Sequence, residues 1–276
     1  MNNQKNYFFI MLMLFATSAP MTGCDDDEDE DEAEGEGDLS VEVWGEDFVE
    51  QGIPADELAD AYSITFDKFL INLGEIKAAA DETSEAPLGE AVYKIWDLAK
   101  PGPLAITGGV VPAGSYHNTT YAINKATASS GAGNALAEDV QMMIDQGLSV
   151  YVQGSATKDT AVTTFKWGFE TNKTYGHCES LAEITDGGQA SIQITIHGDH
   201  LFYDSATSTD PELRFGDIAL ADQDKNGDVT PAELAAYNIT PLANYNVGNL
   251  EIDNLWDYIA HMTTTLGHID GEGHCQ

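Results

Sequence analysis

The segment Ser191-Ile192-Gln193-Ile194-Thr195-Ile196 decides the fold class of this chain, because isoleucine alternates with polar residues along it. Successive side chains of a β-strand point to opposite faces, so this alternation predicts a strand with one buried face. His197 follows the last isoleucine, and we expect it to lie on the polar face of that strand.

Five more segments carry strand signals and are bounded by glycine, proline or asparagine. They are residues 63–73, 91–98, 116–123, 148–157 and 162–169. Lys158-Asp159-Thr160 joins the last two and predicts a hairpin. Residues 135–146 predict a helix within this region. Short strands joined by turns favour a mainly β fold, an antiparallel β-sandwich over residues 41–205.

Four short motifs, in this order, resemble those of the MbnP-like copper-associated lipoproteins. They are Phe66-Asp67, Trp96-Asp97-Leu98, Pro112-Ala113-Gly114-Ser115-Tyr116 and Gly147-Leu148-Ser149-Val150-Tyr151. The resemblance implies a β-sandwich lipoprotein, in a family of which some members bind copper. The copper ligands of that family do not match particular positions of this chain, so no ligand residue is transferred from it.

Residues 222–233 read Asp-Gln-Asp-Lys-Asn-Gly-Asp-Val-Thr-Pro-Ala-Glu and form the motif with the most specific chemistry. They resemble the EF-hand calcium loop, whose pattern D-x-[DN]-x-[DN]-G-x5-E is matched in full. Gly227 stands sixth, where the loop turns sharply. Oxygen ligands in a wide, flexible ring suit calcium better than magnesium. The expected ligands are Asp222, Asp224, Asn226, the carbonyl of Asp228, Thr230 and Glu233. The alternative is a solvated turn.

The segments that flank this loop are less regular than in that family. A helix should enter the loop from Asp210 as N-cap and Pro211 in the first turn, and a short helix over residues 231–237 should leave it. Val229 would normally pair with a second loop, and the sequence contains none. A structural calcium clip, or a weak site filled by extracellular calcium, is favoured over a calmodulin-like switch.

The C-terminal part of the chain, residues 206–276, combines the calcium loop with a further helix. Apolar residues recur at helical spacing over residues 250–266 and predict this helix. We expect a disulfide near the C-terminus to tie this EF-hand-like segment back onto the β domain.

The first 23 residues predict an export signal, because the apolar run over residues 7–15 is too short to cross a bilayer. Met21-Thr22-Gly23-Cys24 resembles the bacterial lipobox, in which the cysteine is lipidated and becomes the first residue of the mature protein. Cleavage after Ala19 is the alternative. Acyl chains on Cys24 would anchor the protein to a bacterial membrane, with the outer membrane or cell surface favoured.

Residues 24–40 predict a disordered acidic tether, because residues 25–38 consist only of aspartate, glutamate, glycine and alanine. The whole chain has 47 acidic against 11 basic residues and a formal net charge of −36. Nucleic acid and anionic lipid surfaces are poor partners for such a field, whereas cations are good ones. The sequence identifies no protein partner.

Cys178 and Cys275 are the two cysteines outside the lipobox, and in an exported protein they predict a disulfide. Thiolate ligation of zinc is the alternative. Each cysteine follows a Gly-His pair, so the disulfide would bring two histidines close together. Several imidazoles on one patch would suit Zn(II) or Cu(II). The candidate ligands are His177, His197, His200, His268 and His274. The alternative is that these histidines only pair with nearby carboxylates.

Catalytic motifs are absent from the sequence: it has no Gly-x-Ser-x-Gly, His-Glu-x-x-His, Walker loop or Cys-x-x-Cys. Three classes of function remain. The first is a calcium-binding, membrane-tethered lipoprotein with a binding or structural role. The second is a copper- or zinc-binding carrier, and the third is a calcium-dependent enzyme acting on an extracellular polymer.

Overall fold

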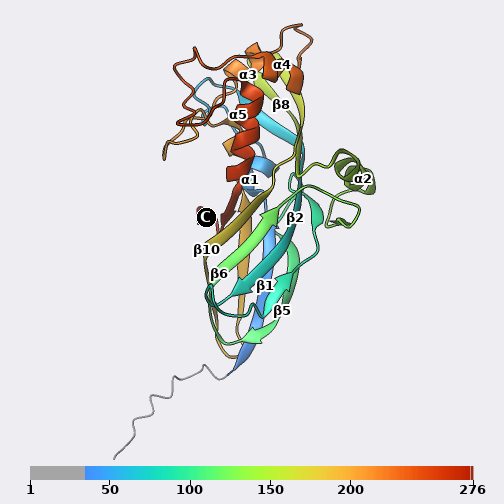
Figure 1. Cartoon of the computed structure of the whole chain (residues 1–276), viewed down its shortest axis with the longest axis vertical. Coiled ribbons are helices and arrows are strands. Elements are labelled where there is room, and N and C mark those ends of the chain that lie inside the picture. The colour runs from blue at the N-terminus through green and yellow to red at the C-terminus, as the bar shows by residue number, and fades with distance from the viewer. Residues whose placement is uncertain (1–34, 274, 276) are drawn as a thin grey trace, which may run out of the picture. The chain divides into compact units, whose positions relative to one another are not determined.

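The computed structural model describes residues 35–273 and residue 275 (Figure 1). Among these residues strands predominate and form two sheets, so the chain is mainly β, as the sequence predicts. None of the described helices is both long and apolar enough to span a membrane. The export signal, Cys24 and His274 lie outside the described residues, and the hypotheses about them stay predictions.

In the four-stranded sheet, the first strand of the described chain, β1 (Glu36–Trp44), is a central strand with a neighbour on each side. The order of this sheet is β13 (Gly267–Ile269), β11 (Gln189–Ile196), β1 and β5 (Leu104–Pro112). β1 and β11 are parallel, in register from Asp38 opposite Gln189 to Trp44 opposite Thr195. The sheets are therefore mixed, and the prediction of antiparallel pairing throughout is wrong here. Because β1 and β11 run the same way, the residues that follow each of them leave the sheet at the same end.

β1 also corrects the predicted boundary of the tether. The tether was expected to reach residue 40, whereas β1 begins at Glu36. Leu39, Val41 and Val43 are buried and alternate with polar residues, which is the ordinary signature of a strand. The acidic run that precedes them conceals this alternation, because composition over a wide window still indicates a solvated segment.

The larger sheet contains most of the predicted strands. Its order is β10 (Lys173–Ile184), β6 (Gly114–Ile123), β2 (Ser63–Ala79), β8 (Val150–Lys158), β9 (Ala161–Phe169) and β12 (Asp228–Val229), with β3 (Leu88–Glu90) and β4 (Lys94–Asp97) paired to β2 and β7 (Gly131–Ala132) to β4. β8 and β9 form the predicted hairpin. The register of β2 against β8 shifts between Phe66 and Lys68, where the sequence alternation is interrupted. β4 is shorter than the strand predicted over residues 91–98.

Both sheets contribute side chains to one large core. Ile192 and Ile194 of β11, Phe69 and Ile71 of β2 and Trp167 of β9 are fully buried in it. Burial of an aliphatic or phenylalanine side chain contributes about 1.5–3 kcal/mol. This shared core fixes the strand ends, and with them the loops that carry the candidate sites.

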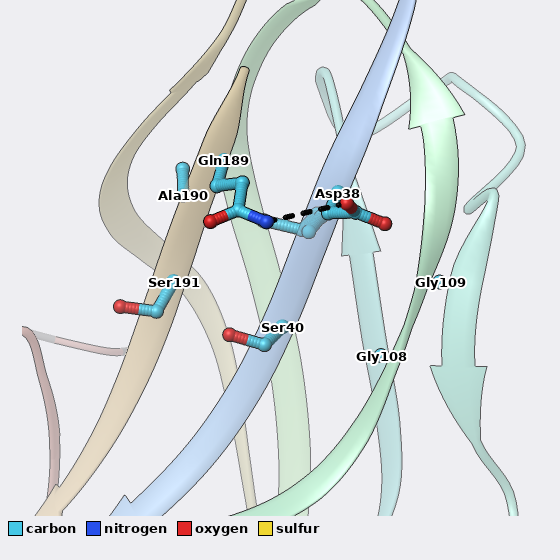
Figure 2. A pocket seen from close by; sticks show the side chains of 8 residues that line it. Asp38, Ser40, Gly108, Gly109, Gln189, Ala190 and Ser191 are labelled. Carbon is cyan, nitrogen blue, oxygen red and sulfur yellow. Dashed lines mark hydrogen bonds between the residues drawn. The ribbon is translucent and has the colours of Figure 1, made fainter. Parts of the chain in front are cut away.

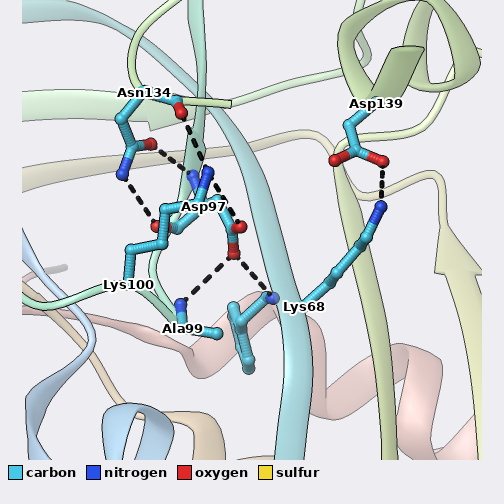
Figure 3. Close-up of polar contacts among 7 residues, drawn as sticks. Lys68, Asp97, Ala99, Lys100, Asn134 and Asp139 are labelled. Atoms are coloured by element: carbon cyan, nitrogen blue, oxygen red, sulfur yellow. Dashed lines mark hydrogen bonds and ion pairs between the residues drawn. The ribbon is translucent and has the colours of Figure 1, made fainter. Parts of the chain in front are cut away.

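A buried polar cluster fastens α2 (Ala137–Gln146) to the larger sheet (Figure 3). Lys68 of β2 pairs with Asp139 in the first turn of α2. Nearby, the Asp97 carboxylate accepts a hydrogen bond from the backbone N–H of Phe69 at 3.3 Å and pairs with Lys100 at 3.3 Å. These contacts neutralise buried charges, so we assign this cluster to stability.

Four short helices lie at or beyond the carboxyl end of β1 (Figure 1). They are α1 (Glu46–Glu50), α3 (Gly216–Leu220), α4 (Pro231–Ala236) and α5 (Leu255–Met262). α4 matches the predicted exit helix. The C-terminal helix is shorter than predicted: it begins after the N-cap Asn254 and continues into the 3₁₀ turn η2 (Thr263–Thr265).

The predicted entry helix is wrong at its start. Asp210 and Pro211 do not begin a helix, and α3 starts only at Gly216. Leu213 instead forms an isolated parallel β-bridge with Leu58, in which the carbonyl of Leu213 accepts from the backbone N–H of Ala59. The carboxylate of Asp60 accepts hydrogen bonds from the backbone N–H groups at the start of α3. A residue far away in sequence thus replaces the local cap.

Candidate metal centres

The predicted calcium loop brings its carboxylates together. One oxygen each of Asp222, Asp224 and Glu233 lies within 4.8 Å of the others. Calcium binds oxygen at about 2.3–2.6 Å, so oxygens on opposite sides of one ion are about 5 Å apart. Gly227 has φ of 81°, in the left-handed region that glycine adopts without strain, as its position in the motif predicts.

Backbone N–H groups hold the ligand side chains of this loop in place. The N–H of Gly227 donates to one oxygen of Asp222 at 2.8 Å, and that of Asn226 donates to the other at 3.2 Å. The Asn226 side-chain oxygen accepts from the N–H of Asp228 at 2.6 Å. The loop is therefore preorganised by its own backbone, which is why its local sequence is sufficient to identify it.

Glu233 closes the loop through a capping box that the sequence analysis did not single out. The Thr230 hydroxyl accepts from the N–H of Glu233 at the start of α4, while the Glu233 carboxylate accepts from the N–H of Thr230 at 3.0 Å. The hydrogen bonds that Thr230 donates to the carboxylate of Glu233 are the main reason why the pKa of Glu233 is lowered. The spacing Thr-x-x-Glu is the signal that would have identified it.

The sheet takes the place of a partner loop. Asp228 and Val229 form β12, which pairs in parallel with Thr164 and Phe165 of β9. Val229 is fully buried, and the indole N–H of Trp167 donates to its carbonyl at 2.9 Å. The eighth residue of the loop thus finds its hydrogen-bonding partner in the β domain, although the chain has no second loop.

A histidine cluster, His197, His200 and His268, forms a second candidate centre. One ring nitrogen of each lies within 4.8 Å of the others. The ring centroids of His197 and His268 are 4.1 Å apart, and those of His197 and His200 are 5.3 Å apart. Tetrahedral zinc needs nitrogens about 3.4 Å apart. The three nitrogens would therefore have to approach one another by up to about 1.4 Å to share one ion.

Three separate elements position this cluster. His197 directly follows β11, His200 lies in the 3₁₀ turn η1 (Gly198–Phe202), and His268 is the central residue of β13. β13 pairs with β11 so that His268 is opposite Thr195. His197 is only 5% exposed, because the hairpin that follows β13 covers it. Thr195 and His197 both donate to the carbonyl of Gly271, so this hairpin covers the polar face of β11 at its end.

Hydrogen bonds fix which nitrogen of two histidines can accept a metal. The Thr265 hydroxyl donates to the carbonyl of Met262 at 2.9 Å, so it accepts from Nδ1 of His200 at 3.0 Å. Nε2 of His197 donates to the carbonyl of Gly271 at 3.3 Å. Each ring therefore carries its proton on the bonded nitrogen, which leaves Nε2 of His200 and Nδ1 of His197 with lone pairs. This is the usual outer arrangement of metal-binding histidines.

Burial keeps His200 in the form that binds metals. Burial, and to a lesser degree His197, lower the pKa of His200 to about 3, so its ring is neutral at physiological pH. Neutral imidazole is the ligand form. A carboxylate oxygen of Glu46 lies 3.5 Å from Nε2 of His197. The pKa of Glu46 is raised, chiefly by burial and further by Glu272 and Asp199, although His197 opposes the shift.

The other histidine predictions have different outcomes. His177 does not join the cluster: its Nδ1 pairs with Glu82 at 2.7 Å, and its side chain is half-exposed. Cys178 and Cys275 form the predicted disulfide, which excludes them as thiolate ligands. His274 lies outside the described residues, so the proposed pairing of His177 with His274 stays a prediction.

A shallow pocket on the outer face of the smaller sheet carries little chemistry (Figure 2). Ser40, Ser191 and Ala190 line it beside two glycines of β5. The Gln189 amide reaches Asp38 across it at 3.4 Å. Its one carboxylate, Asp38, is hydrogen-bonded to Gln189, and the remaining side chains supply neither a base nor a set of metal ligands, so we do not assign a site to it.

Comparison of the chain with protein-family models, curated proteins and solved structures finds no match. The function is therefore argued from the two centres themselves.

Proposed function

We propose that this protein is an exported, lipid-anchored calcium-binding protein in which an EF-hand-type loop is attached to a β-sandwich. The observation that carries the proposal is the convergence of Asp222, Asp224 and Glu233 in a loop whose sequence matches the calcium pattern at every liganding position. Asn226, Thr230 and the carbonyl of Asp228 supply the other oxygens.

The attachment of the loop to β9 supports a structural role for calcium rather than a switching role. Val229 is buried against the sheet, and both helices beside the loop are short. A sensor loop opens long helices to expose a groove, which these helices are too short to form. Calcium here would close the segment between α3 and α4 and hold it on the β domain.

Calorimetric titration of the chain from residue 25 onward tests the proposal. We expect one calcium per chain, with binding abolished by Asp222→Ala and by Glu233→Ala. Asp253→Ala serves as the control, because it removes one acidic charge outside the loop. Unchanged stoichiometry and affinity in both loop variants would exclude the loop as the site.

The anchoring part of the proposal rests on the lipobox and needs a separate test. Cys24→Ala should leave an uncleaved precursor or release the protein from the membrane. A wild-type protein that incorporates no labelled fatty acid in the producing bacterium would contradict lipidation.

We propose a second function, transition-metal binding at the histidine cluster, because one ring nitrogen of each of three histidines from distant segments lies within 4.8 Å of the others. Zn(II) and Cu(II) suit such nitrogen ligands. In buffer with saturating calcium, we expect one Zn(II) per chain and its loss in His200→Gln. His261→Gln, a substitution in α5 outside the cluster, should bind Zn(II) normally. Equal binding by His200→Gln and wild type would exclude the cluster.

A further inference from the structure

Three acidic residues, Glu46, Asp199 and Glu272, lie on the segments that form the histidine cluster or contact it, and Asp199 and Glu272 act electrostatically on Glu46. Glu46 stands at the start of α1, Asp199 lies in η1 beside His200, and Glu272 belongs to the hairpin after β13. Glu46 approaches the cluster directly, with its Oε2 atom 3.5 Å from Nε2 of His197. Asp199 is buried and accepts a hydrogen bond from the Tyr203 hydroxyl at 2.9 Å.

The backbone at Glu46 is held in a conformation that this residue type rarely adopts. Its φ is 57°, in the left-handed region, where a residue with a side chain is strained unless its surroundings impose the conformation. Glycine is the residue type that adopts this conformation without strain, yet the glycine of this segment is residue 45 and the left-handed residue is Glu46. The consequence of placing glutamate here is that a carboxylate, rather than a hydrogen atom, faces the cluster.

Close packing between α1 and η1 maintains this approach. A Cβ atom on Gly198 would lie 2.6 Å from the Val49 side chain and 3.0 Å from that of Phe69. Glycine at residue 198 therefore allows the turn that carries His200 to lie directly against α1. The parallel pairing of β1 with β11 brings the two chain segments to this point from the same end of the sheet.

The carboxylates determine which charge the centre prefers. The three imidazoles are neutral ligands, so compensation for a metal's charge has to come from Glu46, Asp199 and Glu272. Coulomb attraction to these groups doubles when a monovalent ion is replaced by a divalent one. A carboxylate on the outer nitrogen of a ligating histidine also raises the basicity of that ligand. Cu(I) prefers soft sulfur ligands, and this cluster consists of nitrogen and oxygen groups.

We propose that Glu46 is the carboxylate partner of His197 and that, with Asp199 and Glu272, it makes the histidine cluster selective for a divalent ion, Zn(II) or Cu(II), over Cu(I). This inference rests on the proposed transition-metal function of the cluster. Glu46 acts as a positioning residue: its carboxylate lies beside the outer nitrogen of His197, which also donates to the carbonyl of Gly271, while the inner nitrogen binds the ion.

The test measures two affinities on the mature chain in saturating calcium: Zn(II) by competition with a chromophoric chelator, and Cu(I) by competition with bicinchoninate without oxygen. Glu46→Gln keeps the shape of the side chain and removes its charge. Asp47→Asn is the matched control, because it removes the same charge one residue away, where the side chain bonds to Gln51. Glu46→Gly additionally releases the left-handed backbone.

We expect Glu46→Gln to weaken Zn(II) binding by about 10- to 100-fold, the usual effect of losing such a partner, and to change Cu(I) binding much less. Asp47→Asn should leave both affinities near the wild-type values. Glu46→Gly should lose Zn(II) affinity as Glu46→Gln does, while its melting temperature in chelator stays equal to or above that of the wild type.

The outcomes separate this inference from the function on which it rests. Wild-type Zn(II) affinity in Glu46→Gln or in Glu46→Gly would overturn the role of Glu46. Equal losses of Zn(II) and Cu(I) affinity in Glu46→Gln, or a wild type that binds Cu(I) more tightly than Zn(II), would overturn the selectivity for divalent ions. A wild type that binds neither metal at the cluster would instead disprove the transition-metal function itself.

Discussion

The calcium loop and the histidine cluster are two candidate metal centres built in opposite ways. The loop takes all its expected ligands from twelve consecutive residues, and its backbone N–H groups orient them. The cluster takes its ligands from the residue after β11, from η1 and from β13, with 67 residues between His200 and His268. A local site can be recognised from spacing, whereas a distributed site exists only once the strands have paired.

The two centres also depend differently on the rest of the molecule. Calcium at the loop would stabilise its own segment first and the β domain through β12. The histidine cluster requires that β13 and η1 are already in place, so it should respond more strongly to changes elsewhere in the fold.

The largest expected effect is a complete and separate loss of each metal. His268→Gln should abolish Zn(II) binding and leave calcium affinity unchanged, because it removes one of three ligands of the cluster. Glu233→Ala should abolish calcium binding and leave Zn(II) affinity unchanged. Calorimetry of both metals on both variants checks this, and loss of both metals in either variant would show that the two centres are coupled.

Removal of the disulfide should give the second-largest effect and should lower Zn(II) affinity more than calcium affinity. Replacing Cys178 and Cys275 by alanine should lower the free energy of unfolding by about 4 kcal/mol, since the bond closes a loop with a sequence separation of 97 residues. The hairpin that carries His268 precedes Cys275, so Zn(II) affinity should fall more than calcium affinity. Urea denaturation and metal titration measure the two effects, and an equal fall in both affinities would contradict the comparison.

Gly198→Ala should damage the histidine cluster by crowding. The added Cβ would lie against Val49 and Phe69 and push η1 away from α1. Overpacking of this kind costs about 1–3 kcal/mol. We expect a lower melting temperature and weaker Zn(II) binding, with calcium binding unchanged. Gly187→Ala is a suitable comparison variant, since an added Cβ there meets no atom within 4 Å, although its positive φ also disfavours a side chain.

The smallest expected effect concerns the attachment of the calcium loop. Trp167→Phe removes the hydrogen bond to the carbonyl of Val229 and leaves that carbonyl buried. The loss should cost about 1–3 kcal/mol of stability and weaken calcium binding slightly, because β12 is less firmly held. Thermal denaturation with and without calcium checks this. A stability loss that calcium does not partly restore would show that the loop and the sheet act independently.

Several features were predictable because they depend on neighbouring residues. Alternating isoleucines predicted β11, and Lys158-Asp159-Thr160 predicted the hairpin of β8 and β9. The pairing of Cys178 with Cys275 followed from there being two cysteines outside the lipobox. The strand of Leu39, Val41 and Val43 was equally readable, but its acidic surroundings led to a tether being predicted instead.

Other features could not be predicted because they depend on residues far apart in sequence. Asp60 caps α3 across the chain, so the helix begins later than its local cap signal indicates. The sheet substitutes for a partner loop at Val229, which no spacing within residues 222–233 could indicate.

By itself, the sequence determined the mainly β class, the disulfide and the convergence of Asp222, Asp224 and Glu233 in one loop, because each rests on local periodicity, spacing or residue count. The tertiary structure decided which histidines meet. It separated His177 from His197, His200 and His268, and it brought Glu46 to them from the other end of the chain. The physical reason is that the parallel pairing of β1 with β11 and the antiparallel pairing of β13 with β11 set distances that no sequence interval encodes.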